Sequence, residues 1–155
     1  MNKGVKITVI TVISLVLLYL LWGSLNSIVQ TTNWATGKKI LPQALSGTAC
    51  IAQMEEEQFL LCDRVYDLYF QFLMHASPNK SKTPPGGREL LLFTKNGSVL
   101  IRENTEKPNG AEVTIQTAEQ TQTYSLLLTV KFESLVNLFR GTGGENTPVE
   151  NFSFN

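Results

Sequence analysis

The most constraining feature of this chain is an apolar segment over residues 7–25, with the sequence ITVITVISLVLLYLLWGSL. Its nineteen residues include no charged side chain. At about 1.5 Å per residue, a helix of this length spans about 28 Å, close to the ~30 Å hydrocarbon core of a bilayer. The segment therefore predicts a transmembrane helix, and we expect the rest of the chain to work on one side of a membrane.

An uncleaved anchor and a cleaved signal peptide are two interpretations of this segment. The apolar run is longer than the ~7–15 residues of a signal peptide's apolar region, and no A-x-A-like cleavage site follows it. Tyr19 and Trp22 lie near its outer end, where amphipathic rings favour the headgroup level. We therefore expect a signal anchor that stays in the bilayer.

The positive charges predict the orientation of this anchor. Lys3 and Lys6 precede it, and the next positive charge is Lys38. The positive-inside rule then places residues 1–6 in the cytoplasm as a short stub and the rest of the chain on the other side. The expected parts beyond the anchor are a polar tether, one folded domain and a flexible tail, at 26–46, 47–140 and 141–155.

Charge and composition exclude several functions. Lysine plus arginine and aspartate plus glutamate both number 13, so the formal net charge is zero. Without a basic stripe, direct nucleic-acid binding by this chain is not expected. His75 is the only histidine and the sequence contains no C-x-x-C. We therefore expect no catalytic residues, no metal site and no cofactor.

The two cysteines, Cys50 and Cys62, both follow the predicted anchor. An even number in an oxidising compartment favours a disulfide, with two free thiols as the alternative. If 48–54 and 58–64 form a hairpin with Glu55–Glu57 at its tip, Cys50 lies directly opposite Cys62. We therefore expect a Cys50–Cys62 disulfide.

The segment 56–75 is compatible with two kinds of secondary structure. Its aromatic and β-branched residues, with an alternation through Tyr66, Leu68 and Phe70, favour a strand. Its length and the three glutamates at its start favour a helix, because the helix dipole favours negative charge at the N-terminus. We favour a strand, at least over the first half, and keep a helix near 56–75 as the alternative.

Residues 89–104, ELLLFTKNGSVLIREN, contain the clearest local signal. Asn96-Gly97 is the dipeptide that a type I′ hairpin turn favours, because both central residues need positive φ. This pairing places Phe93 opposite Leu100. Both hairpin faces are apolar, whereas a hairpin with one wet face alternates with polar residues. We therefore expect one face to be covered by the core of the domain and the other by a helix or by another chain, and this hairpin is our best candidate for partner contact. The contact residues we expect are Leu91, Phe93, Leu100 and Ile101.

Alternating patterns predict further strands at 111–117 and 121–132, and 133–139 predicts a short helix that ends at Gly141. The expected fold is a single N-terminal transmembrane helix plus a small β-rich domain. This domain is an antiparallel sheet or partly closed barrel, or α+β if 56–75 is helical. A barrel could enclose a small lipophilic ligand. The lining residues we expect in that case are Phe70, Phe72, Leu92 and Leu128.

Three parts of the sequence carry a resemblance: the start MNKGVKITVITVISLVLLYLLW, the Cys50/Cys62 pair and the leucine-rich strand TYSLLLTVKF. In this layout the chain resembles the small single-pass accessory proteins of bacterial membrane-bound winged-helix regulators, the PsaF/MyfF-type and ToxS-like proteins. The cysteine pair favours the fimbrial-regulator branch. The resemblance implies the bacterial inner membrane, with the N-terminus cytoplasmic and the domain periplasmic.

The resemblance also implies a non-enzymatic function, which is to bind and stabilise a bitopic transcriptional regulator. Sensing of an envelope signal, such as pH or a bile-like molecule, is a further implication. The competing function is structural, as a bitopic subunit of a secretion, pilus or conjugation assembly. In both cases the expected partners are a membrane protein and the lipid bilayer, which residues 7–25 contact.

Overall fold

The computed structural model describes residues 3–47, 49–81, 84, 86–141 and 145–150 and, within the long first helix, the side chains of residues 14–22 and 33–44. Three helices and eight strands form this described part of the chain. In chain order they are α1 (Lys3–Ala44), β1 (Ile51–Met54), β2 (Glu57–Leu60), α2 (Asp63–Met74), β3 (Ser77–Pro78), β4 (Glu89–Thr94), β5 (Gly97–Glu103), β6 (Gly110–Thr117), β7 (Thr121–Leu127), α3 (Phe132–Arg140) and β8 (Thr147–Pro148).

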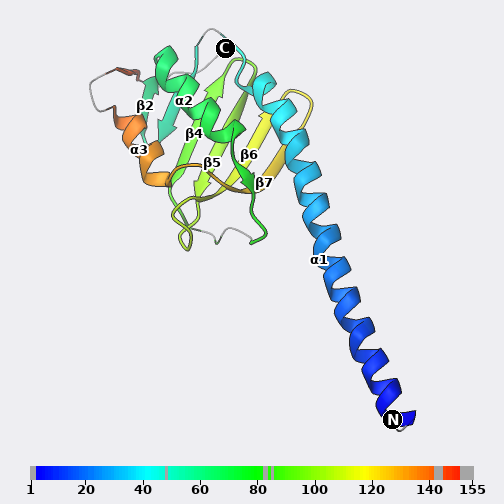
Figure 1. Cartoon of the computed structure of the whole chain (residues 1–155). Coiled ribbons are helices and arrows are strands. Elements are labelled where there is room, and N and C mark those ends of the chain that lie inside the picture. Colours follow the sequence, from blue (N-terminus) through cyan, green and yellow to red (C-terminus); the bar gives the residue numbers. More distant parts are fainter. Residues whose placement is uncertain (1–2, 48, 82–83, 85, 142–144, 151–155) are drawn as a thin grey trace.

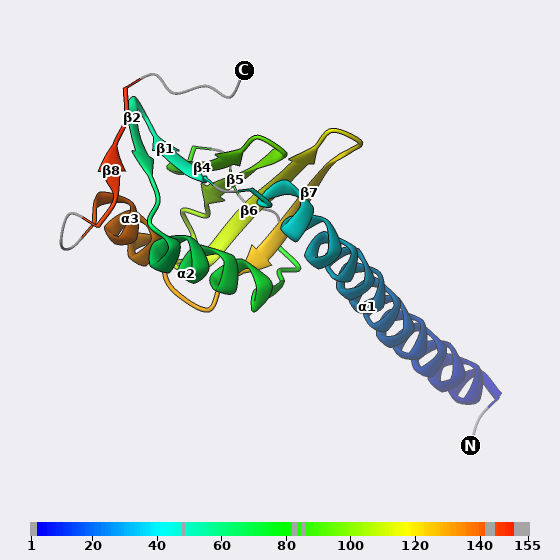
Figure 2. The same ribbon diagram turned by 90° about the horizontal axis from the view of Figure 1, so that it is seen from above.

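All strands belong to one antiparallel sheet in the order β3-β7-β6-β5-β4-β1-β2-β8. The end of α1, α2 and α3 pack on one side of this sheet, here called the covered face (Figures 1 and 2). The other side, here called the open face, carries no described helix. The predicted antiparallel sheet is confirmed. The alternative of a closing barrel is wrong for the described residues, because two separate edge strands, β3 and β8, end the sheet.

The predicted tether over 26–46 is wrong, because α1 runs as one continuous helix through almost all of it. The last turns of α1 pack on the covered face. Trp34, Leu41 and Ala44 recur on one side of the helix and are at most 2% exposed, as expected for an amphipathic segment. The domain is therefore joined to the N-terminal part of the chain by a helix instead of a loop.

Trp34 holds α1 on the sheet through both its ring and its indole nitrogen. Nε1 donates a hydrogen bond to the carbonyl of Ala76 over 2.9 Å. The ring packs edge-on against Tyr124, with centroids 5.1 Å apart, an arrangement that the aromatic quadrupole favours. A Cβ on Gly37 would lie 2.5 Å from the Trp34 ring, so only glycine lets the helix approach this closely.

The other end of α1 extends away from the sheet (Figure 1). Eight consecutive large apolar residues there, Leu15–Trp22, are each 52–79% exposed. Among the residues that the structure describes, no helix is long and apolar enough to cross a membrane. The side chains of residues 7–13 and 23–25 lie outside the described ones, as do residues 1–2 of the expected stub. The transmembrane anchor at 7–25 therefore stays a prediction.

The segment 56–75 contains one short strand and one helix. β2 confirms the strand over its first part, whereas α2 shows that a strand is wrong for the second part and that the helical alternative is right there. Val65, Tyr69 and Leu73, spaced four residues apart, are the buried side of α2. The Tyr69 hydroxyl donates to the carbonyl of Leu135 in α3 over 2.7 Å. Burial against distant elements therefore makes this part of the segment helical, although its local propensity favours a strand.

The β4–β5 hairpin forms where it is predicted, but its register differs by two residues. Leu91 pairs with Leu100 and Phe93 pairs with Ser98. The predicted type I′ turn is wrong, because Asn96 is not among the described residues with positive φ. Since side chains alternate with period two, a two-residue shift leaves every side chain on its predicted face.

Tertiary contacts explain the Asn96-Gly97 dipeptide instead. The Asn96 side-chain amide donates to the carbonyl of Ser46, just after α1, over 2.7 Å. A Cβ on Gly97 would lie 2.3 Å from the carbonyl oxygen of Gln116 and 3.0 Å from the Cα of Ala44. Gly97 is therefore needed for the close approach of α1 and β6 to the hairpin, and not for the turn conformation.

The C-terminal segments are partly as expected. β6 and α3 confirm the predicted strand at 111–117 and the predicted helix, and α3 ends at Gly141 with φ +70°. The strand predicted over 121–132 is confirmed only for 121–127, because residues 128–131 belong to no strand and Phe132 begins α3. The flexible tail over 141–155 is wrong for residues 145–150, where β8 pairs with β2. Asn146 is 5% exposed and accepts a hydrogen bond from the Cys62 amide over 3.3 Å at the start of α2. Residues 142–144 and 151–155 lie outside the described part.

Candidate functional site

The centre of the open face is an apolar strip of three side chains, Leu91 and Phe93 on β4 and Leu100 on β5. Leu91 and Leu100 are direct cross-strand neighbours, and all three side chains are only half-buried. No described helix covers them. Large apolar side chains gathered on an otherwise polar surface are typical of a protein–protein contact.

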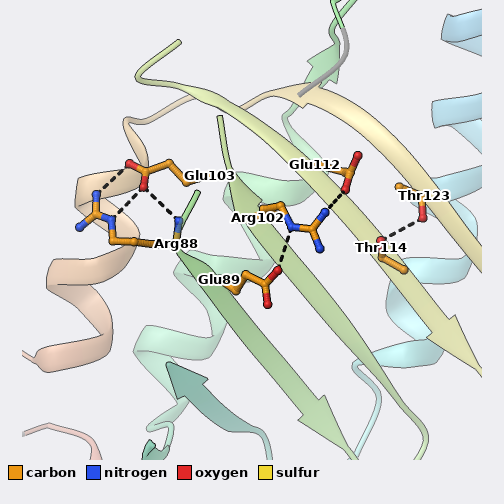
Figure 3. Close-up of polar contacts among 7 residues, drawn as sticks. All are labelled: Arg88, Glu89, Arg102, Glu103, Glu112, Thr114 and Thr123. Carbon is orange, nitrogen blue, oxygen red and sulfur yellow. Dashed lines mark hydrogen bonds and ion pairs between the residues drawn. The ribbon is translucent and has the colours of Figure 1, made fainter. Parts of the chain in front are cut away.

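Polar side chains lie next to the apolar strip on β4, β5 and β6, and Figure 3 shows the contacts among them. Arg102 on β5 donates to Glu89 on β4 and to Glu112 on β6, each over 2.8 Å. Further along, the hydroxyls of Thr114 and Thr123 lie 2.9 Å apart. The hydrogen bond to Glu89 and the charges of Glu89 and Glu112 raise the pKa of Arg102. The border is thus internally paired, as in the polar rim of an interface.

Two shallow hollows flank Leu91. One has a volume of about 580 Å³ and extends between Gln53, Arg88 and Leu100. The other has a volume of about 520 Å³ and extends past Phe93 towards Ser98. Each hollow is wide enough for one or two side chains of a partner. The apolar strip therefore lies between two hollows that side chains of a partner could fill.

The structure brings three of the four predicted contact residues together. Leu91, Phe93 and Leu100 lie on the open face, whereas Ile101 is 0% exposed on the covered face. Including Ile101 among the contact residues was wrong, because adjacent strand residues point to opposite faces of a sheet.

The predicted ligand-lining residues do not form a pocket in the described structure. Leu92 and Leu128 are at most 3% exposed within the core. Phe70 and Phe72 are half-buried on α2 and pack against the same core. Side chains of the three helices pack on the covered face, and none of these four residues lines one of the hollows described here.

The two cysteines are free thiols in the structure. Their predicted direct pairing is wrong by one residue, because the Cys50 carbonyl accepts a hydrogen bond from the amide of Leu61 over 2.9 Å. The hairpin tip has two residues instead of three, with Glu55 at φ +56°. Burial raises the pKa of the Cys50 thiol to about 12, which suppresses its reactivity.

The other residues that could act in catalysis or metal binding form no common site in the described part of the chain. His75 is an exposed residue that ends α2. Among the described residues, no group of three or more His, Cys, Asp and Glu side chains could hold a metal ion.

Sequence reasoning missed a second region, at the outer edge of β7. There a hollow of about 270 Å³ lies between α1 and the end of β3, next to Trp34, Asn79 and Tyr124. These residues are far apart in the sequence, and no local pattern marks them. Only the fold brings them together.

Comparison of the chain with protein-family models, with curated proteins and with solved structures gives no match.

Proposed function

We propose that this chain is a membrane-anchored, non-enzymatic accessory protein that binds and stabilises a partner membrane protein through the open face of its sheet. The observation that carries the proposal is the half-buried apolar strip of Leu91, Phe93 and Leu100. A free antiparallel sheet face normally carries polar residues. Burying this strip against a partner removes its apolar surface from water. This burial stabilises the complex by about 25 cal/mol for each Å² of apolar surface.

The proposed anchor is the segment 7–25 in a bacterial inner membrane, with the domain on the periplasmic side. Its support is the uncharged sequence and the exposed apolar run Leu15–Trp22 of α1. Exposed apolar side chains on this scale are costly in water, because each leaves apolar surface unburied. A bilayer or the transmembrane helix of a partner would cover them.

The proposed partner is a winged-helix transcriptional regulator with one transmembrane span. Its support is the layout, in which an uncharged apolar segment in a helix precedes a sheet domain. The regulator would contact DNA and this chain would not, because the chain has no excess of basic residues.

Co-purification of the full-length chain with a co-expressed regulator of this class from bacterial membranes tests the proposal. Leu100→Asp should reduce the amount of co-purified regulator at least tenfold, because it places a charge in the apolar strip. Gln71→Asp, which adds the same charge on the exposed side of α2, is the matched control and should bind normally.

Two outcomes contradict the proposal. If Leu100→Asp binds the regulator as well as the unchanged protein does, the apolar strip is not the contact. If Leu100→Asp unfolds the domain, as shown by the loss of its cooperative urea transition, the strip belongs to the core. The lifetime of the regulator in cells without this chain measures the stabilising part of the function.

The competing function, a structural subunit of an envelope assembly, is favoured by one observation. α1 is a continuous helix from its exposed apolar residues to its buried ones, which fixes the domain to the anchor instead of letting it swing. Two-hybrid mapping in bacteria separates the two functions. One dominant regulator partner supports the accessory protein, and several membrane subunits that also bind one another support the assembly.

A further inference from the structure

One fully buried apolar residue, Ile51 on β1, lies on the open face of the sheet. It pairs with Phe93 on β4 and with Leu60 on β2, so its side chain points to the same face as the apolar strip. It is 0% exposed, although it does not belong to the core cluster beneath the helices. Phe93 and Leu60 are only half-buried, and they stand beside Ile51 instead of over it. The burial of Ile51 therefore indicates that a further group lies over this part of the open face.

The last described strand brings the C-terminal end of the chain to this same face. β8 follows the edge of β2 (Figure 2), and the amide of Val149 then donates to the carbonyl of Gln58 over 3.0 Å. Pro148 lies opposite Phe59, which packs on the helices. Val149, one residue further, therefore points to the open face. Residues 151–155, which lie outside the described ones, follow from here.

Three hollows that share Gln53 on β1 connect this point with the apolar strip. One, of about 630 Å³, extends from Glu150 across β2 to Gln53, and the other two are those that flank Leu91. Neighbouring strands are about 4.8 Å apart, so the three steps from β8 to β4 cover about 14 Å. Five extended residues span about 17 Å. Residues 151–155 are therefore long enough to reach the apolar strip from Glu150.

The sequence of this segment, NFSFN, suits an apolar sheet surface. Phe152 and Phe154 are two residues apart, and polar residues separate and flank them. In an extended chain, side chains at this spacing point to the same side. Leu91 and Phe93 on β4 recur at the same spacing on the open face. The two phenylalanines can therefore contact this surface together while the polar side chains stay in water.

We propose that residues 151–155 fold back over the open face, with Phe152 and Phe154 on Ile51 and Phe93, and so cover one end of the apolar strip. The proposal rests on the proposed function and adds regulation to the same surface, because a partner that binds the strip first displaces the segment. Covering the strip lowers the apparent affinity for the partner in proportion to the uncovered fraction. A partner that buries the whole strip removes more apolar surface from water than two side chains do, so it can replace them.

Disulfide cross-linking locates the segment without any partner. Ser153→Cys is combined with Gln53→Cys in the full-length chain in detergent micelles. A Cys62→Ser background leaves the buried Cys50 as the only native thiol. Diamide, which oxidises two thiols to a disulfide, should convert most of the protein to an intramolecular cross-link. Gln53 lies two strand spacings from β8, about 10 Å, and the three residues 151–153 span about the same distance.

The matched control is Ser153→Cys combined with Thr114→Cys. Thr114 pairs with Leu100 and therefore points to the same face, but it lies on β6, five strand spacings from β8. This distance of about 24 Å exceeds the reach of three residues, so little cross-link should form. Phe152→Ser together with Phe154→Ser should lower the yield of the Gln53 cross-link severalfold, because it removes the apolar contact.

The regulatory part is tested by co-purification with the regulator. Phe152→Ser together with Phe154→Ser should raise the amount of co-purified regulator severalfold, because the strip no longer has to be uncovered. Asn151→Ser together with Asn155→Ser changes polar residues of the same segment and should leave that amount unchanged. An unchanged amount in the phenylalanine variant would contradict the regulatory part.

Equal cross-linking of the Gln53 and Thr114 pairs, or a yield that does not depend on the phenylalanines, overturns the proposal. A cross-link between two chains, seen as a dimer on a non-reducing gel, assigns the cover to a second copy and also overturns it. An intramolecular cross-link in a protein that binds no regulator contradicts only the proposed function. Regulator binding without the cross-link contradicts only the present proposal, so the two failures are distinguishable.

Discussion

The two faces of the central hairpin both carry apolar side chains, but these side chains differ in their exposure to solvent. On the covered face, Leu92 and Val99 are 0% exposed. On the open face, the apolar strip starting at Leu91 is half-exposed. Hydrophobicity is therefore not what separates core from surface here. The position of three helices, all on one side of the sheet, makes the difference between Leu92 and Leu91.

The largest predicted difference between a buried position and one nearer the surface is the reactivity of the two cysteine thiols. Burial raises the pKa of Cys50 to about 12 from its ordinary value of 9.0, which lowers its thiolate fraction about a thousandfold. Cys62, which is half-buried at the start of α2, should react with iodoacetamide in the native protein, and Cys50 only after unfolding in urea. Mass spectrometry of the labelled peptides measures this. A disulfide between the two cysteines in exported protein would contradict the free thiols.

The next contrast is between adjacent leucines on β4. Leu92→Ala should cost about 2–5 kcal/mol of unfolding free energy, because it leaves a cavity in a filled core. Leu91→Ala should cost less than about 1 kcal/mol, because its side chain is half-exposed. Urea unfolding of the full-length chain in micelles, followed by Trp34 emission in the Trp22→Phe background, measures both. Similar losses would show that the open face is covered by something within the chain.

The contact of α1 with the hairpin should be sensitive to a single methyl group. Gly97→Ala places a Cβ 2.3 Å from the Gln116 carbonyl, so the strands must shift, at a cost of about 1–3 kcal/mol. Ser98→Ala, the adjacent half-buried position, is the control and should change the unfolding free energy by less than about 0.5 kcal/mol. An unchanged urea midpoint for Gly97→Ala would mean that β6 and α1 do not approach Gly97 this closely.

The smallest effect concerns Glu103 on β5, which Arg88 holds through two hydrogen bonds of 2.8 Å (Figure 3). This pairing lowers the pKa of Glu103. The stabilisation is complete above the ordinary carboxyl pKa of 4.5 and is lost as the pH falls through the lower folded-state value. Arg88→Met should therefore reduce the loss of stability between pH 5 and pH 3, by less than about 1 kcal/mol because the pair is partly exposed. Identical acid dependence in the two proteins would contradict the pairing.

Much of the sheet could be predicted from the sequence. The apolar hairpin at 89–104 and the alternation over 111–117 correspond to β4, β5 and β6, because a period of two directly encodes which side chains share a face. The alternation over 121–132 corresponds to β7 only as far as Leu127. The apolar strip followed from the same reasoning, with Ile101 as the one misplaced residue. Each side chain of the hairpin lies on the face where its alternation places it, although the predicted register is wrong by two residues.

The remaining parts could not be predicted, for reasons that are specific to each. α1 continues through a polar stretch because Trp34 and Leu41 bury on a sheet that lies later in the chain. α2 is helical because Val65, Tyr69 and Leu73 meet α3 and the covered face. Whether Cys50 lies opposite Cys62 depends on whether the turn of the hairpin has two or three residues. The turn has two residues, and Glu55 adopts a positive φ in it.

The sequence by itself determined that an uncharged apolar helix precedes a β-rich domain and that one hairpin is apolar on both sides. Composition and periodicity are local properties, so they can be read without the fold. Only the tertiary structure decided which of the two apolar faces the three helices cover and why Asn96-Gly97 stands at the hairpin. Each of these depends on contacts between residues about 20 to 90 positions apart, which packing establishes and no local pattern records.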